Sequence, residues 1–248
     1  MVKGLDTFRK YFADYEEQYV LIGGAACDIL FESNEVNFRA TRDLDMVLIV
    51  EALTPEFGEK FWKFIVDGKY RNKATNGSNP QFYRFDKPED DNFPKMIELF
   101  CRSDFKLKDA KGITPIHIDD EVSSLSAILL NDDYYKALLN GKEVRNGLSV
   151  LRPEYIILFK AKAYLDLKKQ KDLGEKVDSS DIKKHKKDVL RIASELMLEK
   201  VEELPIAVDA DIHSFIDLLE QEPFDQNSLK RFGLKNEDVV EVLKQVFG

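Results

Sequence analysis

Two aspartates, Asp43 and Asp45, stand two residues apart at the head of an apolar run. If this run is a strand, its period of two places both carboxylates on the same face. Two carboxylates held this close repel each other unless a cation lies between them. A solvated strand start is the alternative, but Leu44 and Met46–Val50 indicate a strand that is buried on both faces. We therefore predict that the two aspartates bind a metal ion.

A pair of glycines, Gly23-Gly24, separates the short apolar run Tyr19–Ile22 from a helical pattern over Ala25–Phe31. Glycine lets the backbone approach a phosphate closely, and the first N–H groups of a helix point towards an anion bound there. A Gly-Gly pair before a helix is common, so its meaning depends on the aspartates that follow it.

A third carboxylate, Glu98, stands inside the apolar segment Met96–Cys101. A glutamate in such a strand costs free energy unless it is exposed or paired. It is either an edge-strand residue that faces water or a third ligand of the metal. The histidines, His117, His185 and His213, are too scattered for a zinc site. A metal bound by carboxylates is typically Mg²⁺ or Mn²⁺.

The elements that would position these residues divide the chain in two. The first 150 residues or so mix helical and strand patterns. Helices are predicted at Leu5–Tyr15, Ala25–Phe31, Phe57–Val66 and Asp132–Leu139, and strands at Tyr19–Ile22, Leu44–Val50, Gln81–Phe85, Met96–Cys101 and Val144–Val150, the last as a strand or hairpin arm. Residues 113–130 are ambiguous.

From Arg152-Pro153 onwards the pattern is helical. Helices are predicted at Glu154–Lys169, Asp181–Leu198, Asp211–Glu220 and Asn236–Phe247, with Ser179-Ser180 as the N-cap of the second. We predict an α/β (α+β) fold, in which a mixed-sheet domain (residues 1–151) precedes a helical domain (residues 152–248).

Charge is distributed unevenly over the chain. The net charge is −9, which argues against nonspecific DNA binding. Residues 160–187 nevertheless carry ten lysines against five acids, whereas residues 195–247 carry thirteen acids against five basic residues. The lysine-rich stretch is either a solvated helix pair or a surface that binds phosphates.

The first motif resembles that of a known enzyme family. Gly23, Gly24 and Ala26 fit a Gly-Gly-x-Ala pattern, and Arg39, Thr41, Asp43 and Asp45 fit an Arg-x-Ser/Thr-x-Asp-apolar-Asp run. Together they resemble the AbiEii/AbiGii toxin family of nucleotidyltransferases, within the polymerase-β-type superfamily. The 18 residues between Gly24 and Asp43 exceed the usual spacer of the superfamily, so this connection is expected to be extended.

A second motif in the helical half follows in the order of the same family. Lys160 to Ala163 fits its Lys-x-x-Ala pattern, and Lys184 to Asp188 fits its Lys-Asp-x-x-Asp pattern, except that His185 replaces the first aspartate. Two simpler interpretations stay open. Lys184 and Asp188 have the spacing of a surface ion pair worth a few tenths of a kcal/mol. Lys160 either extends outwards from its apolar helix or faces a polar cleft.

The resemblance implies a nucleotidyltransferase core whose cleft is completed by the helical domain. Its implied metal ligands are Asp43, Asp45 and Glu98, its nucleotide-binding residues Gly23, Gly24, Arg39, Thr41, Lys160 and Lys184, and its catalytic residues Asp43, Asp45, Lys160 and Asp188. The implied reaction moves a nucleotidyl group from an NTP to an acceptor hydroxyl, with Mg²⁺ or Mn²⁺ as cofactor and pyrophosphate as leaving group. The family further suggests tRNA as acceptor and a protein antitoxin as partner.

Two other functions stay open at this stage. One is a small-molecule nucleotidyltransferase of the aminoglycoside-resistance type, which the negative net charge favours. The other is a nucleotide-binding module without turnover, against which the intact aspartates speak. The two cysteines, Cys27 and Cys101, are expected to be buried thiols of a cytoplasmic protein. No signal peptide or membrane span is expected.

Overall fold

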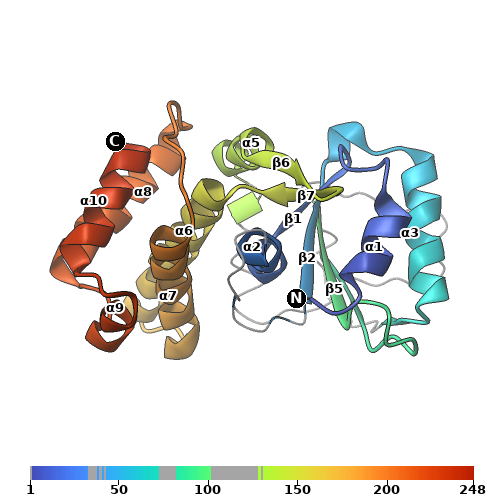
Figure 1. The fold of residues 1–248 in the computed structure, drawn as a ribbon, viewed down its shortest axis with the longest axis horizontal. Helices are drawn as coiled ribbons and strands as arrows, with labels where there is room; N and C mark the ends of the chain where they lie inside the picture. Colours follow the sequence, from blue (N-terminus) through green and yellow to red (C-terminus); the bar gives the residue numbers. More distant parts are fainter. Residues whose placement is uncertain are drawn as a thin grey trace. The chain divides into compact units, whose positions relative to one another are not determined.

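The computed structural model has an α/β fold in which a mixed sheet is followed by a run of helices (Figure 1). It describes residues 2–32, 38, 41, 43–72, 82–101, 128–129 and 131–248. The chain forms two compact units, of which the first carries the sheet and the second is helical. The predicted fold class is confirmed.

The first unit consists of a sheet and the helices that cover it. In the described residues its helices are α1 (Leu5–Phe12), α2 (Gly23–Glu32), α3 (Pro55–Asp67) and the 3₁₀ helix η1 (Val50–Ala52). Its strands are β1 (Tyr19–Ile22), β2 (Asp43–Leu48), β3 (Arg71–Asn72), β4 (Phe82–Asp86), β5 (Met96–Cys101), β6 (Lys142–Arg145) and β7 (Leu148–Leu151). They lie in the order β3-β4-β5-β2-β1-β7-β6.

The sheet is mixed, with both parallel and antiparallel pairs of neighbouring strands. The pairs β1–β7 and β2–β5 are parallel, whereas β1–β2, β3–β4, β4–β5 and β6–β7 are antiparallel. Strand β2 lies in the interior of the sheet, and its residues 46–48 are buried. Helices α1 and α3 lie on one face and α2 on the other (Figure 1). The prediction that the aspartates begin a strand buried on both faces is confirmed.

Aromatic side chains fill the layer formed by α1 and α3. Phe8 and Phe12 of α1 and Phe61 and Phe64 of α3 are completely excluded from solvent. The rings of Phe12 and Phe64 lie with their centroids 5.4 Å apart. Helix α3 begins where Thr54 accepts a hydrogen bond from a backbone N–H of the first turn, which is the behaviour of an N-cap. This packing fixes one face of the sheet and leaves the other to α2.

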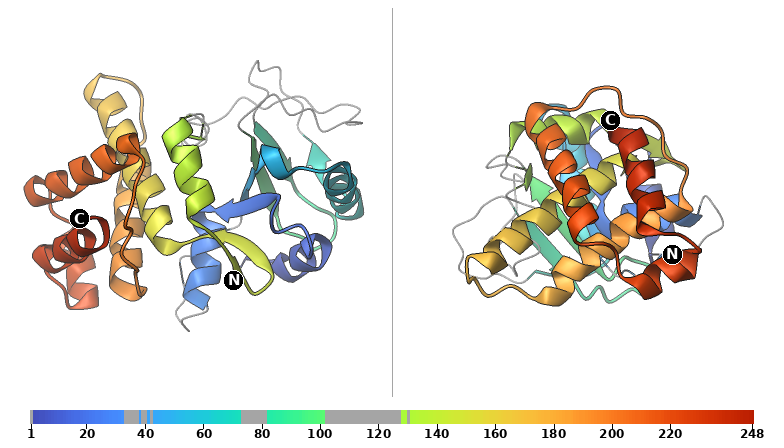
Figure 2. Two further views of the ribbon diagram at one scale, coloured as in Figure 1. Left: turned by 90° about the horizontal axis from the view of Figure 1, so that it is seen from above. Right: turned by 90° about the vertical axis from the view of Figure 1, so that its left-hand side faces the viewer.

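The second unit contains the helices α5 (Asp132–Asn140), α6 (Pro153–Asp172), α7 (Ser179–Glu195), α8 (Ile206–Gln221), α9 (Gln226–Phe232) and α10 (Asn236–Phe247) in its described part. Helix α6 packs against α7 and α8, and α8 packs against α10 (Figure 2). The predicted change to an all-helical pattern coincides with the end of β7. Helix α5, which the sequence placed in the first domain, groups with the second unit.

The structure corrects several predicted boundaries. Helix α8 begins at Ile206, before the predicted start at Asp211, and α9 was not predicted. Asp178 is the N-cap of α7, because its side chain accepts the N–H of Ser180 at 2.8 Å, so the prediction of an N-cap at Ser179-Ser180 is wrong. Aspartate is as good an N-cap as serine, and its negative charge is also stabilised by the positive end of the helix dipole.

The predicted strand or hairpin arm at Val144–Val150 and the predicted burial of both cysteines are confirmed. Residues 144–150 belong to the β6–β7 hairpin, whose turn contains Asn146 and Gly147. Helix α5 ends at Asn140, with Gly141 as C-cap. Cys27 and Cys101 are buried, free thiols. Among the described residues, no helix combines the length and apolar character needed to cross a membrane.

Candidate active site

The turn between β1 and α2 has room only for glycine. Gly23 has φ of +60°, and a Cβ atom there would lie 2.1 Å from Oδ2 of Asp45. A Cβ atom on Gly24 would lie 2.7 Å from Oγ1 of Thr41. Both glycines therefore let polar side chains approach the backbone at the start of α2, where helix N–H groups favour negative charge. The Gly-Gly motif is therefore explained by the close approach of Asp45 and Thr41 to these two positions.

The register of the sheet brings three carboxylates to one face. Asp43 and Asp45 alternate along β2 and so share a face. Strand β5 runs parallel to β2, with Glu98 directly opposite Asp45 and Met96 opposite Asp43. Neighbouring strands lie about 4.8 Å apart, so the two opposed acids are within reach of each other. Of the two interpretations of Glu98, an edge residue facing water is excluded, because β5 is an interior strand and Glu98 is buried.

Arg84 on β4 holds this third carboxylate. It stands opposite Glu98 in the β4–β5 pair. Its Nε and Nη2 atoms lie 2.8 Å and 2.5 Å from Oε1 of Glu98. The sequence analysis did not predict a role for Arg84. A single cation in one apolar strand and a single acid in the next could have suggested that the two side chains pair. The pairing relieves the free-energy cost of burying Glu98.

The pKa of Glu98 in this carboxyl cluster is shifted. Burial raises the pKa of the Glu98 carboxyl, and the charge of Asp43 acts in the same direction. The Arg84 guanidinium and a hydrogen bond with Asp45 oppose this shift without cancelling it. A hydrogen bond between two carboxyl groups needs one proton, because an ionised carboxylate cannot donate. A contact between Asp45 and Glu98 is therefore most favourable when one of the two acids carries a proton.

The donor chemistry of the cluster fits a divalent cation. Carboxylate oxygens are the ligands that Mg²⁺ and Mn²⁺ prefer. In the ranges that the structure describes, no trio of His, Cys, Asp or Glu side chains is already arranged as a metal site. Arg84 and Asp45 both engage Glu98 instead. Asp43 and Asp45, on one face beside the Gly23 turn, are the pair that fits a cation, and Glu98 as a third ligand stays a prediction.

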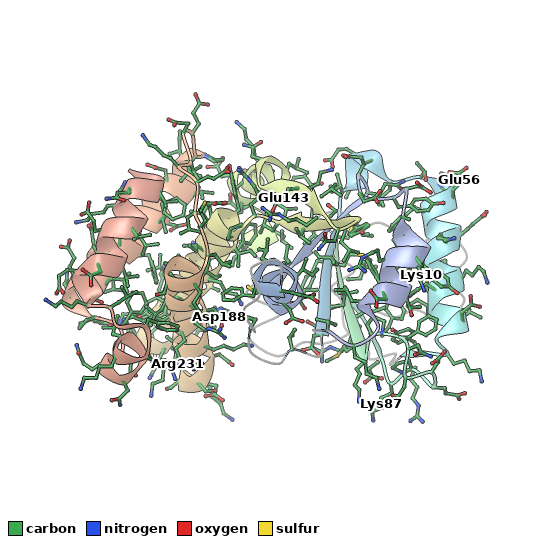
Figure 3. The ribbon with its side chains drawn as sticks, viewed as in Figure 1. Lys10, Glu56, Lys87, Glu143, Asp188 and Arg231 are labelled. Atoms are coloured by element: carbon green, nitrogen blue, oxygen red, sulfur yellow. The ribbon has the colours of Figure 1, made fainter. Side chains whose placement is uncertain are left out.

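The second unit contains a buried ion pair between two of the predicted residues. Nζ of Lys160 on α6 lies 3.1 Å from Oδ2 of Asp188 on α7. The side chains are only 9% and 3% exposed, so the pair is shielded from water. Figure 3 labels Asp188 on its helix. Because Asp188 is buried, an ion pair of this residue at the protein surface is excluded, and Lys160 does not extend outwards into solvent.

The predicted site residues thus fall into two groups. Those of the first unit that the structure brings together are Gly23, Gly24, Thr41, Asp43, Asp45 and Glu98. Lys160 and Asp188 meet in the second unit, where Lys184 is half-buried on α7 and His185 is buried. Arg39 lies outside the described residues. Whether the two groups act on one substrate stays a prediction.

The likeness of this chain to known proteins is to solved structures. No family model matches the chain, and no curated protein matches it. Among solved structures, the chain is similar to an antigenic nucleotidyltransferase-like protein from Paracoccidioides brasiliensis, with 15% sequence identity and a TM-score of 0.48. The likeness covers 99% of this chain and 95% of that chain. The chemistry of the site is therefore argued from its own residues.

Proposed function

We propose that the protein is a metal-dependent nucleotidyltransferase that moves a nucleotidyl group from an NTP to an acceptor hydroxyl and releases pyrophosphate. The observation that supports this most is the position of Asp43, Asp45 and Glu98 on one sheet face. They adjoin a helix start at which Gly23 leaves no space for a side chain. A carboxylate cluster beside phosphate-binding N–H groups suits a reactant that carries both a cation and a triphosphate.

Each residue of the first group has a task in this proposal. The first N–H groups of α2 and the Thr41 hydroxyl bind phosphate oxygens, and Arg84 fixes the orientation of Glu98. Asp43 and Asp45 hold the cation, with Glu98 as the candidate third ligand. Bound Mg²⁺ or Mn²⁺ supplies charge neutralisation and lowers the pKa of the acceptor hydroxyl.

Lys160 and Lys184 are proposed to neutralise charge on the triphosphate, with Asp188 in support. The buried contact between Lys160 and Asp188 gives these two residues a second possible task, which is to hold α6 against α7. The two tasks predict different behaviour of a variant that lacks Lys160 and of a double variant that also lacks the Asp188 carboxylate.

The acceptor and the biological role are proposed from the sequence motif. We favour a toxin of a toxin–antitoxin or abortive-infection system that acts on tRNA and is neutralised by a protein antitoxin. A small-molecule acceptor of the aminoglycoside type is the second candidate, and the net charge of −9 favours it. A cytoplasmic location is part of the proposal.

The direct test is incubation with labelled NTPs, Mg²⁺ and a pool of total RNA, followed by a small-molecule pool. We expect label in one pool and pyrophosphate release with the wild-type protein. Asp43→Asn should abolish both, whereas Asp91→Asn, a matched change at an aspartate whose side chain is 84% exposed, should leave them intact. Release that is equal in both variants would refute the assignment of Asp43.

A binding module without turnover is tested by calorimetry. Titration of the protein with NTP and Mg²⁺ measures binding, and pyrophosphate release measures turnover. Binding without release in either acceptor pool would favour the module over the transferase.

A further inference from the structure

The end of the α6–α7 hairpin is strongly basic in an acidic protein. Residues 168–187 contain eight lysines and four acids, a net charge of +4 against −9 for the whole chain. They comprise the end of α6, the connector and the first part of α7. Figure 2 shows the connector between the C-terminal end of α6 and the N-terminal end of α7. We call residues 168–187 the lysine hairpin.

Some of its lysines stabilise the second unit. Nζ of Lys168 lies 3.0 Å from Oε1 of Glu222. Lys186 donates to the Pro223 carbonyl at 3.2 Å, with its Nζ 5.6 Å from the ring centres of Tyr164 and Phe224. Burial lowers the pKa of Lys186. These two lysines attach the hairpin to the segment after α8 and are occupied by that task.

Other lysines of the hairpin point their charge to solvent. Lys169, Lys176, Lys183 and Lys187 are exposed. In the described part of the chain, no carboxylate lies within ion-pair distance of Lys169, Lys176 or Lys183. Lys183 and Lys187 are one helical turn apart, about 6 Å along α7, and so lie on the same side of the helix. The surface therefore presents several cations at once, of which Lys187 also interacts electrostatically with the Asp225 carboxylate.

We propose that the lysine hairpin binds the phosphate backbone of an RNA. This assigns a binding surface to the RNA acceptor of the proposed transfer and rests on that proposed function. Lysine is a compact point charge that contacts phosphates without reading bases. Lysine is depleted at protein–protein interfaces, so this surface suits RNA better than an acidic protein. The remainder of the chain is acidic overall and so attracts a polyanion less than this hairpin does.

Fluorescence anisotropy with a short labelled RNA stem-loop, without NTP or Mg²⁺, tests the inference. The test variant is Lys183→Gln with Lys187→Gln. The control is Lys10→Gln with Lys95→Gln, two exposed lysines of the first unit that change the net charge equally. Figure 3 labels Lys10 on α1.

Each lost phosphate contact lowers the slope of log Kd against log salt by about 0.7 to 0.9. We expect the test variant to lose roughly 1.4 to 1.8 of slope and to bind at least about tenfold more weakly at low salt. The control variant should stay within about twofold of wild type.

Three results would overturn the inference: no salt-dependent RNA binding by wild type, equal weakening in both variants, or lysine-dependent binding to anionic vesicles of phosphatidylserine without binding to RNA. Pyrophosphate release is measured separately on wild type and Asp43→Asn. If transfer depends on Asp43 but RNA binding is unchanged in the lysine variant, the RNA-binding role of the lysine hairpin is refuted and the proposed active site is not. RNA binding that depends on Lys183 and Lys187, with full transfer in Asp43→Asn, refutes the proposed active site alone.

Discussion

Asp45 and Glu98 stand directly opposite each other on the parallel strands β2 and β5, and Asp45 is one of the groups that influence the pKa of Glu98. This contact joins residues that are far apart in the chain. Burial and the charge of Asp43 raise the pKa of Glu98, so the cluster takes up a proton more readily than three separate carboxylates would. The relationship sets the first prediction, because an amide in place of one carboxyl also donates a hydrogen bond.

Asp45→Asn should leave the metal-free protein as stable as wild type or more stable. The asparagine amide donates to the Glu98 carboxylate, and one carboxyl group fewer is available to repel Asp43. Mg²⁺ with NTP should raise the melting temperature of wild type by mass action and raise that of the variant much less. Melting curves with and without these ligands check this. A strongly destabilised metal-free variant, or equal shifts in both proteins, would contradict the assignment of Asp45 as a metal ligand.

Arg84→Met should destabilise the protein by about 1–3 kcal/mol, because it leaves Glu98 buried without its cationic partner. The loss stays below the value for a fully buried pair, since Glu98 can keep a proton and the side chain of Arg84 is 24% exposed. Adding Glu98→Gln should recover much of the stability. Urea denaturation of the two single variants and the double variant gives the coupling energy. Additive effects would show that the contact between the two side chains contributes little.

Gly23→Ala should cost more stability than Gly233→Ala. Both glycines have positive φ, +60° and +68°, so alanine adds backbone strain of about 1–2 kcal/mol at each position. At Gly233 nothing lies within 4 Å of the added Cβ, whereas at Gly23 it meets Oδ2 of Asp45. The excess loss measures this close approach. Calorimetry of both variants provides the comparison, and equal losses would mean that Asp45 moves aside freely.

Lys160→Met should lower NTP use and also destabilise the protein, because it leaves Asp188 buried without its cation. Adding Asp188→Asn should restore much of the stability. If Lys160 serves the triphosphate, the double variant should fold well and still show a raised KM, a lowered kcat or both. Recovery of turnover together with stability would make Lys160 a structural residue. Steady-state kinetics and melting curves on the same samples separate the two outcomes.

Glu222 should make a small pH-dependent contribution to the stability of the second unit. A hydrogen bond from Lys168 holds the pKa of Glu222 below its usual value of about 4.5. A lowered folded-state pKa stabilises the protein above the unfolded value, and this contribution disappears as the pH falls through the folded-state pKa. Because Glu222 is largely exposed, Glu222→Gln should cost less than about 1 kcal/mol at pH 7 and a smaller amount at pH 3. Urea denaturation at both pH values provides the test, and an equal loss at both would contradict it.

Local sequence pattern determined much of the first unit. The two-residue spacing of Asp43 and Asp45 placed their carboxylates on one face, because side chains in any strand alternate between faces. The apolar run after them indicated an interior strand, and the long helices α6 and α7 followed from their periodicity. These features depend on backbone geometry over a few residues, which the order of residues reveals directly.

Tertiary structure alone decided which distant residues meet. No local pattern states that β5 pairs in parallel with β2 and in the register that opposes Glu98 to Asp45, or that β4 brings Arg84 to the same carboxylate. The contact between Lys160 and Asp188 likewise depends on how α6 packs against α7. Strand register and helix packing are set by the burial of whole apolar faces, a property of the folded chain that spacing along the sequence does not contain.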